Sequence, residues 1–253
     1  MGAFFVLACF SQQSALAADC APPDTPAAVT VSYVYDGDTL MLADQRKIRL
    51  IGVNTPEAAR PGSPAEPLSL EARNRVRQIL LGSGNQAHML PGEEQTDHYA
   101  RNLAHLWTPD GQNLTALLLR EGLGWALAIP PNIRLLDCYL EAERDARAAS
   151  RGVWNRPAFA ATDSARLSLR STGFQRVRGR VIRVNRGGGA TWINLEGRFA
   201  IRIPDKHRHW FSPSPDQTWV GRNLEVRGWV KQIKGELRVS VQHPAAITLQ
   251  PLQ

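Results

Sequence analysis

The sequence predicts a mainly β protein with additional helices (an α+β protein), arranged as two small β-barrels in succession. Short segments of β-branched and aromatic residues alternate with turn residues along the 253-residue chain, whereas helical spacing is confined to three segments of the first part. Charge divides the chain as well. About 16 basic and 18 acidic side chains precede Gly173, and about 14 basic and 5 acidic side chains follow from there. This asymmetry predicts two domains with different roles.

The first barrel begins with closely spaced strands. Asp36-Gly37 is a turn pair between two strand-like segments, and residues 43–46 form the next turn before a third strand. This meander opens a small antiparallel barrel that two later segments extend. The expected strands are residues 29–35, 39–42, 48–53, 86–90 and 103–107.

Three helices are expected in the same part of the chain. Apolar residues between Leu70 and Leu81 lie mostly on one helical face, and Ser69 is a suitable cap for this helix. Residues 113–121 form the second expected helix, which Gly122 ends, and residues 135–150 form the third.

A second barrel is expected after residues 156–172, which lack a clear periodicity and are predicted to be a linker. Five short strands follow, with one longer connection after the third, and this arrangement is typical of an OB-type barrel. The expected strands are residues 177–184, 191–195, 199–203, 223–230 and 236–241. The predicted domains are therefore residues 28–155 and 173–253.

The N-terminus resembles an export signal. Residues 2–7 are apolar, and Ala15-Leu16-Ala17 followed by Ala18 is a small-residue cleavage pattern. We expect a signal peptide over residues 1–18, a short arm over 19–27 and a periplasmic or secreted protein. Val6-Leu7-Ala8-Cys9 also resembles a lipoprotein cleavage box, which leaves anchoring at Cys9 as an alternative. No other segment is long and apolar enough to span a membrane.

Removal of the signal segment leaves two cysteines, Cys20 and Cys138. An even pair in an exported protein predicts a possible disulfide, which would pin the N-terminal arm to the last helix. Closing so long a loop stabilises a protein by roughly 2–4 kcal/mol. The alternative is two unpaired thiols. No cysteine and histidine spacing suggests zinc.

Acidic and basic side chains gather around residues 36–57. Carboxylate and amide oxygens there suit a hard divalent cation, and Arg49 suits a phosphate. A second arginine, Arg101, follows in the motif Asp97-His98-Tyr99-Ala100-Arg101. Phosphodiester hydrolysis needs neutralised phosphate charge and an aligned water, and these residue types supply both. Asp36 is expected to shape the turn rather than to bind the metal.

These motifs resemble those of the staphylococcal nuclease (thermonuclease) family. The resemblance covers roughly residues 28–155, and its several motifs occur in the family's order. It implies an OB-type barrel with three helices that cleaves DNA or RNA. The matching segments are residues 36–39, 49–57, 97–104, 120–125 and 149–154.

The resemblance also implies a role for each matching residue. Asp38, Asn54 and the backbone carbonyl of Thr55 correspond to the calcium ligands, with another divalent metal as an alternative. Glu57 corresponds to the residue that positions or activates the attacking water.

The remaining matches concern the substrate. Arg49 and Arg101 correspond to the two arginines that bind the scissile phosphate, and Tyr99 corresponds to an aromatic residue beside the nucleotide.

Two departures from the family pattern affect these expectations. Asn54 stands where the family usually has a second aspartate, so the site loses one negative charge and is expected to bind calcium more weakly. The segment Trp125 to Pro131 also lacks the two tyrosines that the family's type member has near the bound nucleotide.

The leading hypothesis is an exported calcium-dependent endonuclease with little sequence specificity. The alternatives are a catalytically weakened nuclease fold that acts as a nucleic-acid-binding module, and an envelope interaction protein.

The basic second barrel allows three interpretations. Its arginines and aromatic residues could bind DNA or RNA, they could keep the barrel soluble and fill its core, or the charge could hold the protein at a cell wall or membrane surface. Arg178 and Arg180 are two residues apart and therefore share one face of a strand. The residues concerned are Arg178, Arg180, Arg183, Arg186, Trp192, Phe199, Trp210, Trp219 and Trp229.

Overall fold

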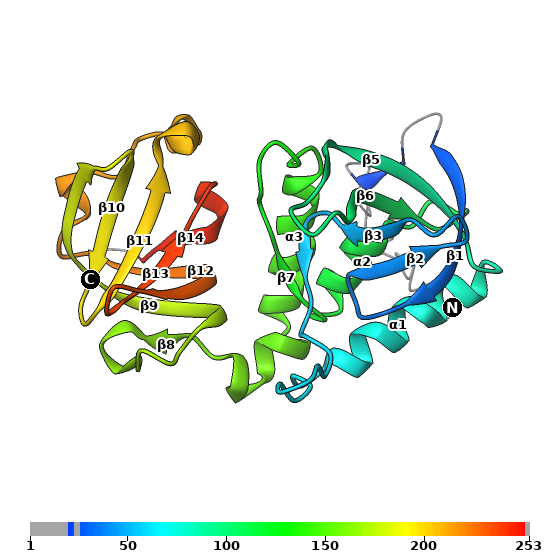
Figure 1. Cartoon of the computed structure of the whole chain (residues 1–253), viewed down its shortest axis with the longest axis horizontal. Helices are drawn as coiled ribbons and strands as arrows, with labels where there is room; N and C mark the ends of the chain where they lie inside the picture. The colour runs from blue at the N-terminus through cyan, green and yellow to red at the C-terminus, as the bar shows by residue number, and fades with distance from the viewer. Residues whose placement is uncertain (1–19, 23–25, 251–253) are drawn as a thin grey trace, which may run out of the picture.

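A computed structural model of the chain describes residues 20–22 and 26–250 and contains two β-barrels. Helix α3 (Leu136–Ala148) of the first part lies toward the second barrel (Figure 1). The expected signal peptide and Cys9 lie outside the described residues, so both remain predictions. Within the described residues, no helix is long and apolar enough to cross a membrane.

The first barrel is closed by five strands in the order β1-β2-β3-β6-β5. Neighbouring strands are antiparallel except β3 and β6, which are parallel. This order, with the fifth strand between the third and the fourth, makes the barrel OB-type as predicted. The strands are β1 (Ala27–Val34), β2 (Thr39–Leu42), β3 (Lys47–Leu50), β5 (Gln86–Thr96) and β6 (Asn102–Trp107).

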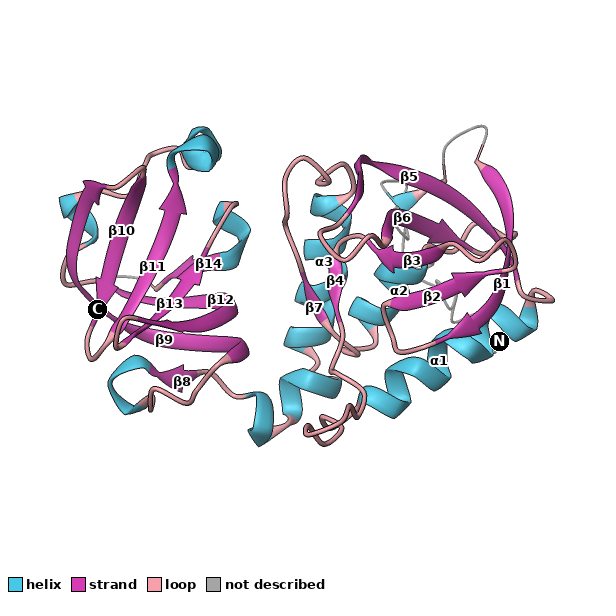
Figure 2. Ribbon diagram, viewed as in Figure 1, coloured by secondary structure: helices cyan, strands magenta, loops and turns pink. Residues whose placement is uncertain are grey.

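Alternate residues of these strands fill the barrel core, because successive side chains of a strand point to opposite faces. Leu40, Leu42, Ile48 and Leu106 are each at most 1% exposed. Helices α1 (Ser69–Gly82) and α2 (Leu114–Arg120) cover the barrel together with α3, and all three predicted helices are confirmed. In Figure 2 the longer helices belong to the first barrel, and the second carries only short helical turns.

The prediction that Ser69 caps α1 is wrong. Leu68, with a φ of 67°, occupies the cap position, and no side chain caps the helix. Ser69 is instead the first helical residue, and its hydroxyl donates to the carbonyl of Glu66 at 2.7 Å. The helix therefore begins one residue earlier than a cap at Ser69 would require.

The prediction of one continuous strand over residues 48–53 is also wrong. The chain leaves the barrel after β3, turns at Gly52 and forms a separate short strand β4 (Val53–Asn54), which pairs with β7 (Trp125–Ala126). Gly52 has a φ of +87°, and a Cβ there would lie 2.2 Å from the ring of Tyr139. The break directs Asn54 and Thr55 back toward the turn between β1 and β2.

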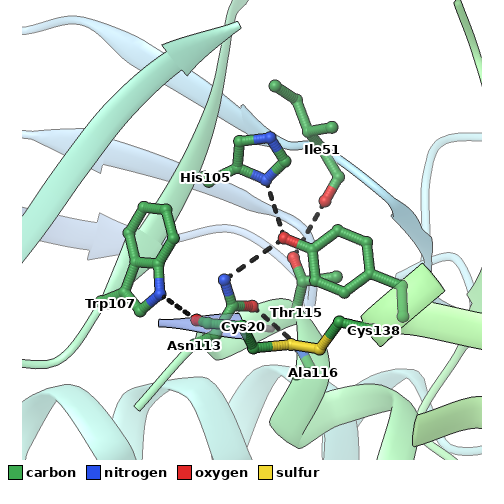
Figure 3. Close-up of a disulfide and its surroundings, with 9 residues drawn as sticks. Cys20, Ile51, His105, Trp107, Asn113, Thr115, Ala116 and Cys138 are labelled. Atoms are coloured by element: carbon green, nitrogen blue, oxygen red, sulfur yellow. Dashed lines mark hydrogen bonds between the residues drawn. A yellow bond between two sulfur atoms is a disulfide. The ribbon is translucent and has the colours of Figure 1, made fainter. Parts of the chain in front are cut away.

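The predicted disulfide between Cys20 and Cys138 is present, with the two Cα atoms 5.8 Å apart. It ties the N-terminal arm to α3 beside a buried polar cluster (Figure 3). The carbonyl of Cys20 accepts a hydrogen bond from the indole of Trp107 at 2.7 Å. In the same cluster, the hydroxyl of Tyr139 lies 2.7 Å from Nδ1 of His105.

The second barrel has the same strand order as the first, β9-β10-β11-β13-β12, and a β12–β9 pairing closes it. Its third and fifth strands, β11 and β13, are again parallel. Two 3-10 turns, η5 (Asp205–Trp210) and η6 (Gln217–Trp219), occupy the long connection expected after the third strand. The strands are β9 (Gly173–Gly187), β10 (Ala190–Leu195), β11 (Phe199–Pro204), β12 (Asn223–Ile233) and β13 (Glu236–Ser240).

Short elements also lie around this barrel. The segment expected to be a featureless linker contains the turn η3 (Pro157–Phe159), the strand β8 (Thr162–Asp163) and the turn η4 (Ser164–Arg166). β8 pairs with β9, and β14 (Ile247–Leu249) pairs with β12. Much of the predicted linker is thus bound to the second barrel.

An aromatic cluster joins the two barrels. Trp125 of β7 has its ring centroid 5.0 Å from that of Phe159 and 5.1 Å from that of Phe174 in β9. Phe174 in turn lies 5.2 Å from Trp229 of β12. The segment in which the family's tyrosines are missing is therefore packed against the second barrel through Trp125.

Candidate active site

The turn between β1 and β2 places the first acids of the site. The backbone nitrogen of Asp38 donates to Oδ1 of Asp36 at 3.0 Å, which is the turn-shaping contact expected of Asp36. Gly37 lies so close to its neighbours that a Cβ there would be 2.7 Å from side-chain atoms of Ala72 and Thr55. The turn is therefore fixed against α1 and against the segment that follows β4.

Asp38 is buried, with 6% of the residue exposed, and both carboxylate oxygens are occupied. Oδ1 accepts from the hydroxyl of Thr39 at 3.0 Å. Oδ2 accepts from the backbone nitrogen of Thr55 at 2.9 Å and from its hydroxyl at 3.1 Å. These contacts hold the carboxylate in one orientation between the β1–β2 turn and the end of β4.

Arg49 reaches the same point from β3. Its Nη1 donates to the carbonyls of Leu50 at 2.9 Å and Val53 at 2.8 Å. Its Nη2 lies 3.2 Å from Oδ2 of Asp38 and donates to Oδ1 of Asn54 at 3.4 Å. The guanidinium thus bridges two of the predicted metal ligands.

Arg101 joins the site through a shared hydroxyl. Its Nη1 donates to Oγ1 of Thr39 at 3.4 Å, and the same hydroxyl donates to Asp38. Sequence reasoning gave no role to Asp97, yet Oδ2 of Asp97 accepts from Nε of Arg101 at 2.8 Å and lies 2.7 Å from Nη2. The four-residue spacing within the Asp97–Arg101 motif was the available signal.

The charge of Asp97 is well stabilised. Burial by itself would raise the pKa of this carboxyl, but hydrogen bonds from the backbone and side chain of Arg101 and from the backbone of Tyr99 outweigh it, so the pKa is lowered. Asp97 is therefore a charged carboxylate where it contacts Arg101. Tyr99 is 70% exposed, and the guanidinium carbon of Arg101 lies 5.4 Å from its ring centroid. Its ring is on the surface rather than in the core.

Glu57 follows β4 and is ion-paired with Arg60, a residue that sequence reasoning did not select. Its backbone nitrogen donates to Oε2 of Glu66 at 2.9 Å. Burial raises the pKa of the Glu57 carboxyl, although the positive charge of Arg60 opposes the shift. A carboxylate with a raised pKa is a stronger base than a free one.

The residues fit an oxygen-preferring divalent cation. Thr55 contacts Asp38 directly, and Arg49 links Asp38 to the amide oxygen of Asn54, so these residues meet at the end of β4. Asp36 lies beside them and contacts the backbone of Asp38. Burial, followed by the negative charge of Asp38, raises the pKa of Asp36 to about 6. A cation would relieve this crowding of negative charge, and hard oxygen donors are what calcium prefers. Within the described residues, no group of three or more His, Cys, Asp or Glu residues is arranged to hold a metal.

Comparison with known proteins places this site in a family. Residues 47–156 match the staphylococcal nuclease homologue family. The chain is 31% identical to a thermonuclease of Staphylococcus intermedius over 129 residues, which are 50% of this chain and 75% of that protein. The chain belongs to the staphylococcal nuclease family.

Other proteins named as nucleases are similar to about half of this chain. The thermonuclease of Staphylococcus hyicus is 28% identical over 128 residues, 49% of this chain and 74% of that protein. Endonuclease YncB of Bacillus subtilis (strain 168) is 29% identical over 135 residues, 52% of this chain and 63% of that protein. The second barrel lies beyond the residues that match the family.

The geometry brings the predicted residues of this family member together around Asp38. Asp38 itself precedes the matched residues, and the pairing of Thr39 with Arg49 across β2 and β3 places it in the site. Asn54 and Thr55 contact Arg49 and Asp38 directly. The charges of Asp38 and Arg49 also act on the carboxyl of Glu57, although Glu57 forms its ion pair with Arg60. The functional roles of these residues remain predictions.

Proposed function

We propose that the protein is an exported nuclease that uses calcium to hydrolyse phosphodiester bonds of DNA or RNA with little sequence specificity. The observation that carries this proposal is the convergence of Arg49 and Arg101 on Asp38, one directly and one through the hydroxyl of Thr39. Two guanidinium groups beside a cation site suit the negative charge that builds up on a phosphodiester in the phosphorane-like transition state of its hydrolysis.

The proposed mechanism gives each residue a distinct task. Asp38, Asn54 and the Thr55 carbonyl would hold the cation, which when bound would supply positive charge against the developing charge on the phosphate. Arg49 is free to exchange its contacts with Asp38 and Asn54 for phosphate oxygens. Arg101 would keep its contacts with Asp97 and direct its remaining N–H donors toward the phosphate.

Glu57 is the proposed acceptor of the proton of the attacking water. Its raised pKa suits this role, and Arg60 is the group that it would leave when substrate enters. Removal of such a base typically costs about 10²- to 10⁴-fold in rate.

Export is part of the proposal. The small-residue pattern at residues 15–18 supports a cleaved signal peptide, and the disulfide between Cys20 and Cys138 is consistent with an oxidising compartment. Periplasmic and secreted locations are both compatible with these features.

The competing proposal is a nucleic-acid-binding module with weakened catalysis. Asn54 favours it, because it removes a charge from the cation site. The retention of Glu57 beside the two arginines favours the enzyme, because binding alone does not need a water-positioning acid.

The deciding experiment is a cleavage assay of the purified mature chain on single-stranded DNA, duplex DNA and RNA with calcium, magnesium or chelator. We expect cleavage with calcium, none with chelator, and a loss of about 10²-fold or more in Glu57→Gln. Binding without turnover under every divalent metal would establish the binding module and overturn the nuclease.

A further inference from the structure

The outer face of the second barrel carries a row of basic and aromatic side chains. Trp192 of β10 lies opposite Arg202 of β11, and Asn194 of β10 lies opposite Arg183 of β9. Opposed residues of paired strands point to the same side of a sheet. Trp192, Asn194 and Arg202 are half-buried, whereas the intervening Ile193 is fully buried in the core.

The basic row continues across the neighbouring strands. Arg238 of β13 lies opposite Ala200 of β11, and Lys231 of β12 lies opposite Arg238. We call the residues Arg183, Trp192, Asn194, Arg202, Lys231 and Arg238 the β10–β11 face. Strands β10 and β11 are the second and third strands of an OB-type barrel, and this is the face on which OB-type barrels bind oligonucleotides.

Trp192 is held as a platform on this face. Its indole nitrogen donates to the carbonyl of Gly187 at 3.1 Å, and the guanidinium carbon of Arg238 lies 5.0 Å from its ring centroid. A fixed aromatic ring next to a cation is the combination that stacks on a nucleobase and contacts the adjoining phosphate.

A hollow of about 270 Å³ is lined by Asn194 of β10 and Ala200 of β11, the same two strands. Arg183 and Arg198 also line it, and the side chain of Asn194 accepts from Nε of Arg183 at 3.4 Å. The one acidic residue that lines the hollow is Glu236. Its Oε2 lies 3.0 Å from Nη2 of Arg238, so the ion pair neutralises its charge. Arg198 and Arg202 form no ion pair with any described residue, so their charge is available to an anion.

Charge and position both favour a polyanionic ligand. From Gly173 onward the chain has about 14 basic side chains against about 5 acidic ones. Figure 1 shows β10 and β11 on the side of the second barrel away from α3, so these two strands lie away from the contact with the first barrel, which β12 makes through Arg227.

We propose that the β10–β11 face is a second site, which binds single-stranded nucleic acid through stacking on Trp192 and phosphate contacts from Arg183 and Arg202. Bases in a duplex are stacked on one another and cannot use Trp192, so the face prefers single strands. Such a site would hold substrate on the same molecule as the Asp38 site and so deepens the proposed nuclease function on which it rests.

The test measures binding of the full mature chain to a fluorescein-labelled oligothymidylate of about 20 nucleotides by fluorescence anisotropy in chelator, where metal-dependent cleavage cannot occur. We expect Trp192→Ala to weaken binding about 5- to 150-fold, as the loss of one stacked base does, while Trp192→Phe stays near wild type. Duplex binding should change little in either variant.

The arginines give a second and independent readout. The double variant Arg183→Ala and Arg202→Ala should make the slope of log affinity against log salt shallower by about 1.4, because two phosphate contacts with single-stranded nucleic acid are lost. The matched control is Arg77→Ala, an exposed arginine of α1 in the first barrel, which should leave the slope unchanged. Thermal melting confirms that each variant is folded.

Three results would overturn the proposal. The first is that the wild-type chain does not bind the oligonucleotide at about 50 mM salt. The second is that variants of the β10–β11 face bind the oligonucleotide as tightly as wild type does. The third is that these variants lose binding to phosphatidylglycerol vesicles but not to the oligonucleotide. The last result would assign the face to a membrane surface. Because binding is measured without metal, failure here is separate from failure of cleavage with calcium.

Discussion

Nη1 of Arg227 in β12 lies 2.6 Å from Oε2 of Glu143 in α3. The other carboxylate oxygen of Glu143, Oε1, accepts from the backbone nitrogen of Ala126 at 2.7 Å. Ala126 belongs to β7, which pairs with β4, the strand that carries Asn54. One buried carboxylate therefore connects the second barrel to the strand pair that positions the candidate metal ligands.

We expect Arg227→Met to destabilise the protein by roughly 3–5 kcal/mol. Both side chains of the pair are about nine-tenths buried, and removing the cation leaves the Glu143 carboxylate buried without a counter-charge. Thermal melting and urea titration of the purified chain measure this loss.

The double variant Arg227→Met with Glu143→Gln is the control for that prediction. The introduced glutamine would keep an acceptor for Ala126 but carries no charge, so we expect it to recover most of the lost stability. A double variant as unstable as Arg227→Met would show that packing, and not the unpaired charge, causes the loss.

We expect Asn54→Asp to lower the calcium concentration needed for half-maximal cleavage by roughly tenfold. The added carboxylate would lie beside Asp38 and restore a second charged ligand, and ligand charge is a main determinant of calcium affinity. Calorimetric calcium titration and the calcium dependence of cleavage measure the effect. The same calcium requirement in both proteins would remove Asn54 from the proposed ligand set.

We expect Asp97→Asn to lower cleavage by about tenfold while leaving the fold intact. Asp97 fixes Arg101 through two contacts to one carboxylate oxygen, and an amide oxygen holds a guanidinium more weakly. If Asp97 only positions Arg101, Arg101→Ala should be no less impaired than the Asp97→Asn, Arg101→Ala double variant. Additive losses in the double variant would mean that Asp97 acts on its own.

Local sequence was enough to predict most of the helices and strands, and it selected candidate site residues whose roles remain predictions. Residues 39–42 form a strand with the predicted bounds because Asp36-Gly37 and the turn at residues 43–46 delimit it on both sides. Gly52 could have revealed the break between β3 and β4, since a glycine inside a strand pattern often marks a bulge or a close approach.

Apart from the disulfide between Cys20 and Cys138, tertiary contacts could not be predicted in this way. Nothing near Arg49 in the sequence indicates that its guanidinium bridges Asp38 and Asn54, and nothing near Glu143 indicates Arg227. These pairs depend on how β3 meets the β1–β2 turn and on how the second barrel meets α3. The burial of Phe199 could not be predicted either: its aromatic ring could serve stacking or core packing on sequence grounds, and the residue is only 2% exposed in the barrel core.

Removing the disulfide in the Cys20→Ser, Cys138→Ser double variant should cost roughly 4 kcal/mol of unfolding free energy. The bridge spans 118 residues, and the conformational entropy that the unfolded chain gains when the bridge is removed rises with the length of the loop. Urea titration of the oxidised wild type, the reduced wild type and the variant measures it. Equal stability of oxidised and reduced wild type would contradict the prediction.

His105 makes stability depend on pH. Burial, and to a lesser extent the positive charge of Arg134, lowers the pKa of His105 to about 4 from its usual 6.5. Between these values the unfolded chain binds a proton that the folded chain does not, so folding stability rises with pH through this window and is lost as pH falls. The contribution amounts to about 3 kcal/mol between pH 6.5 and pH 4.

A His105→Gln variant isolates this effect from that of the acidic residues, because they titrate in both proteins. The introduced glutamine would offer a neutral partner to the hydroxyl of Tyr139, which now lies 2.7 Å from Nδ1 of His105. We expect the variant to be somewhat less stable than wild type at pH 7, and the gap to narrow or reverse near pH 4, since only wild type must keep an imidazole neutral there. Urea titrations of both proteins at several pH values test this, and a gap that stays constant would show that His105 does not titrate differently in the folded and unfolded chains.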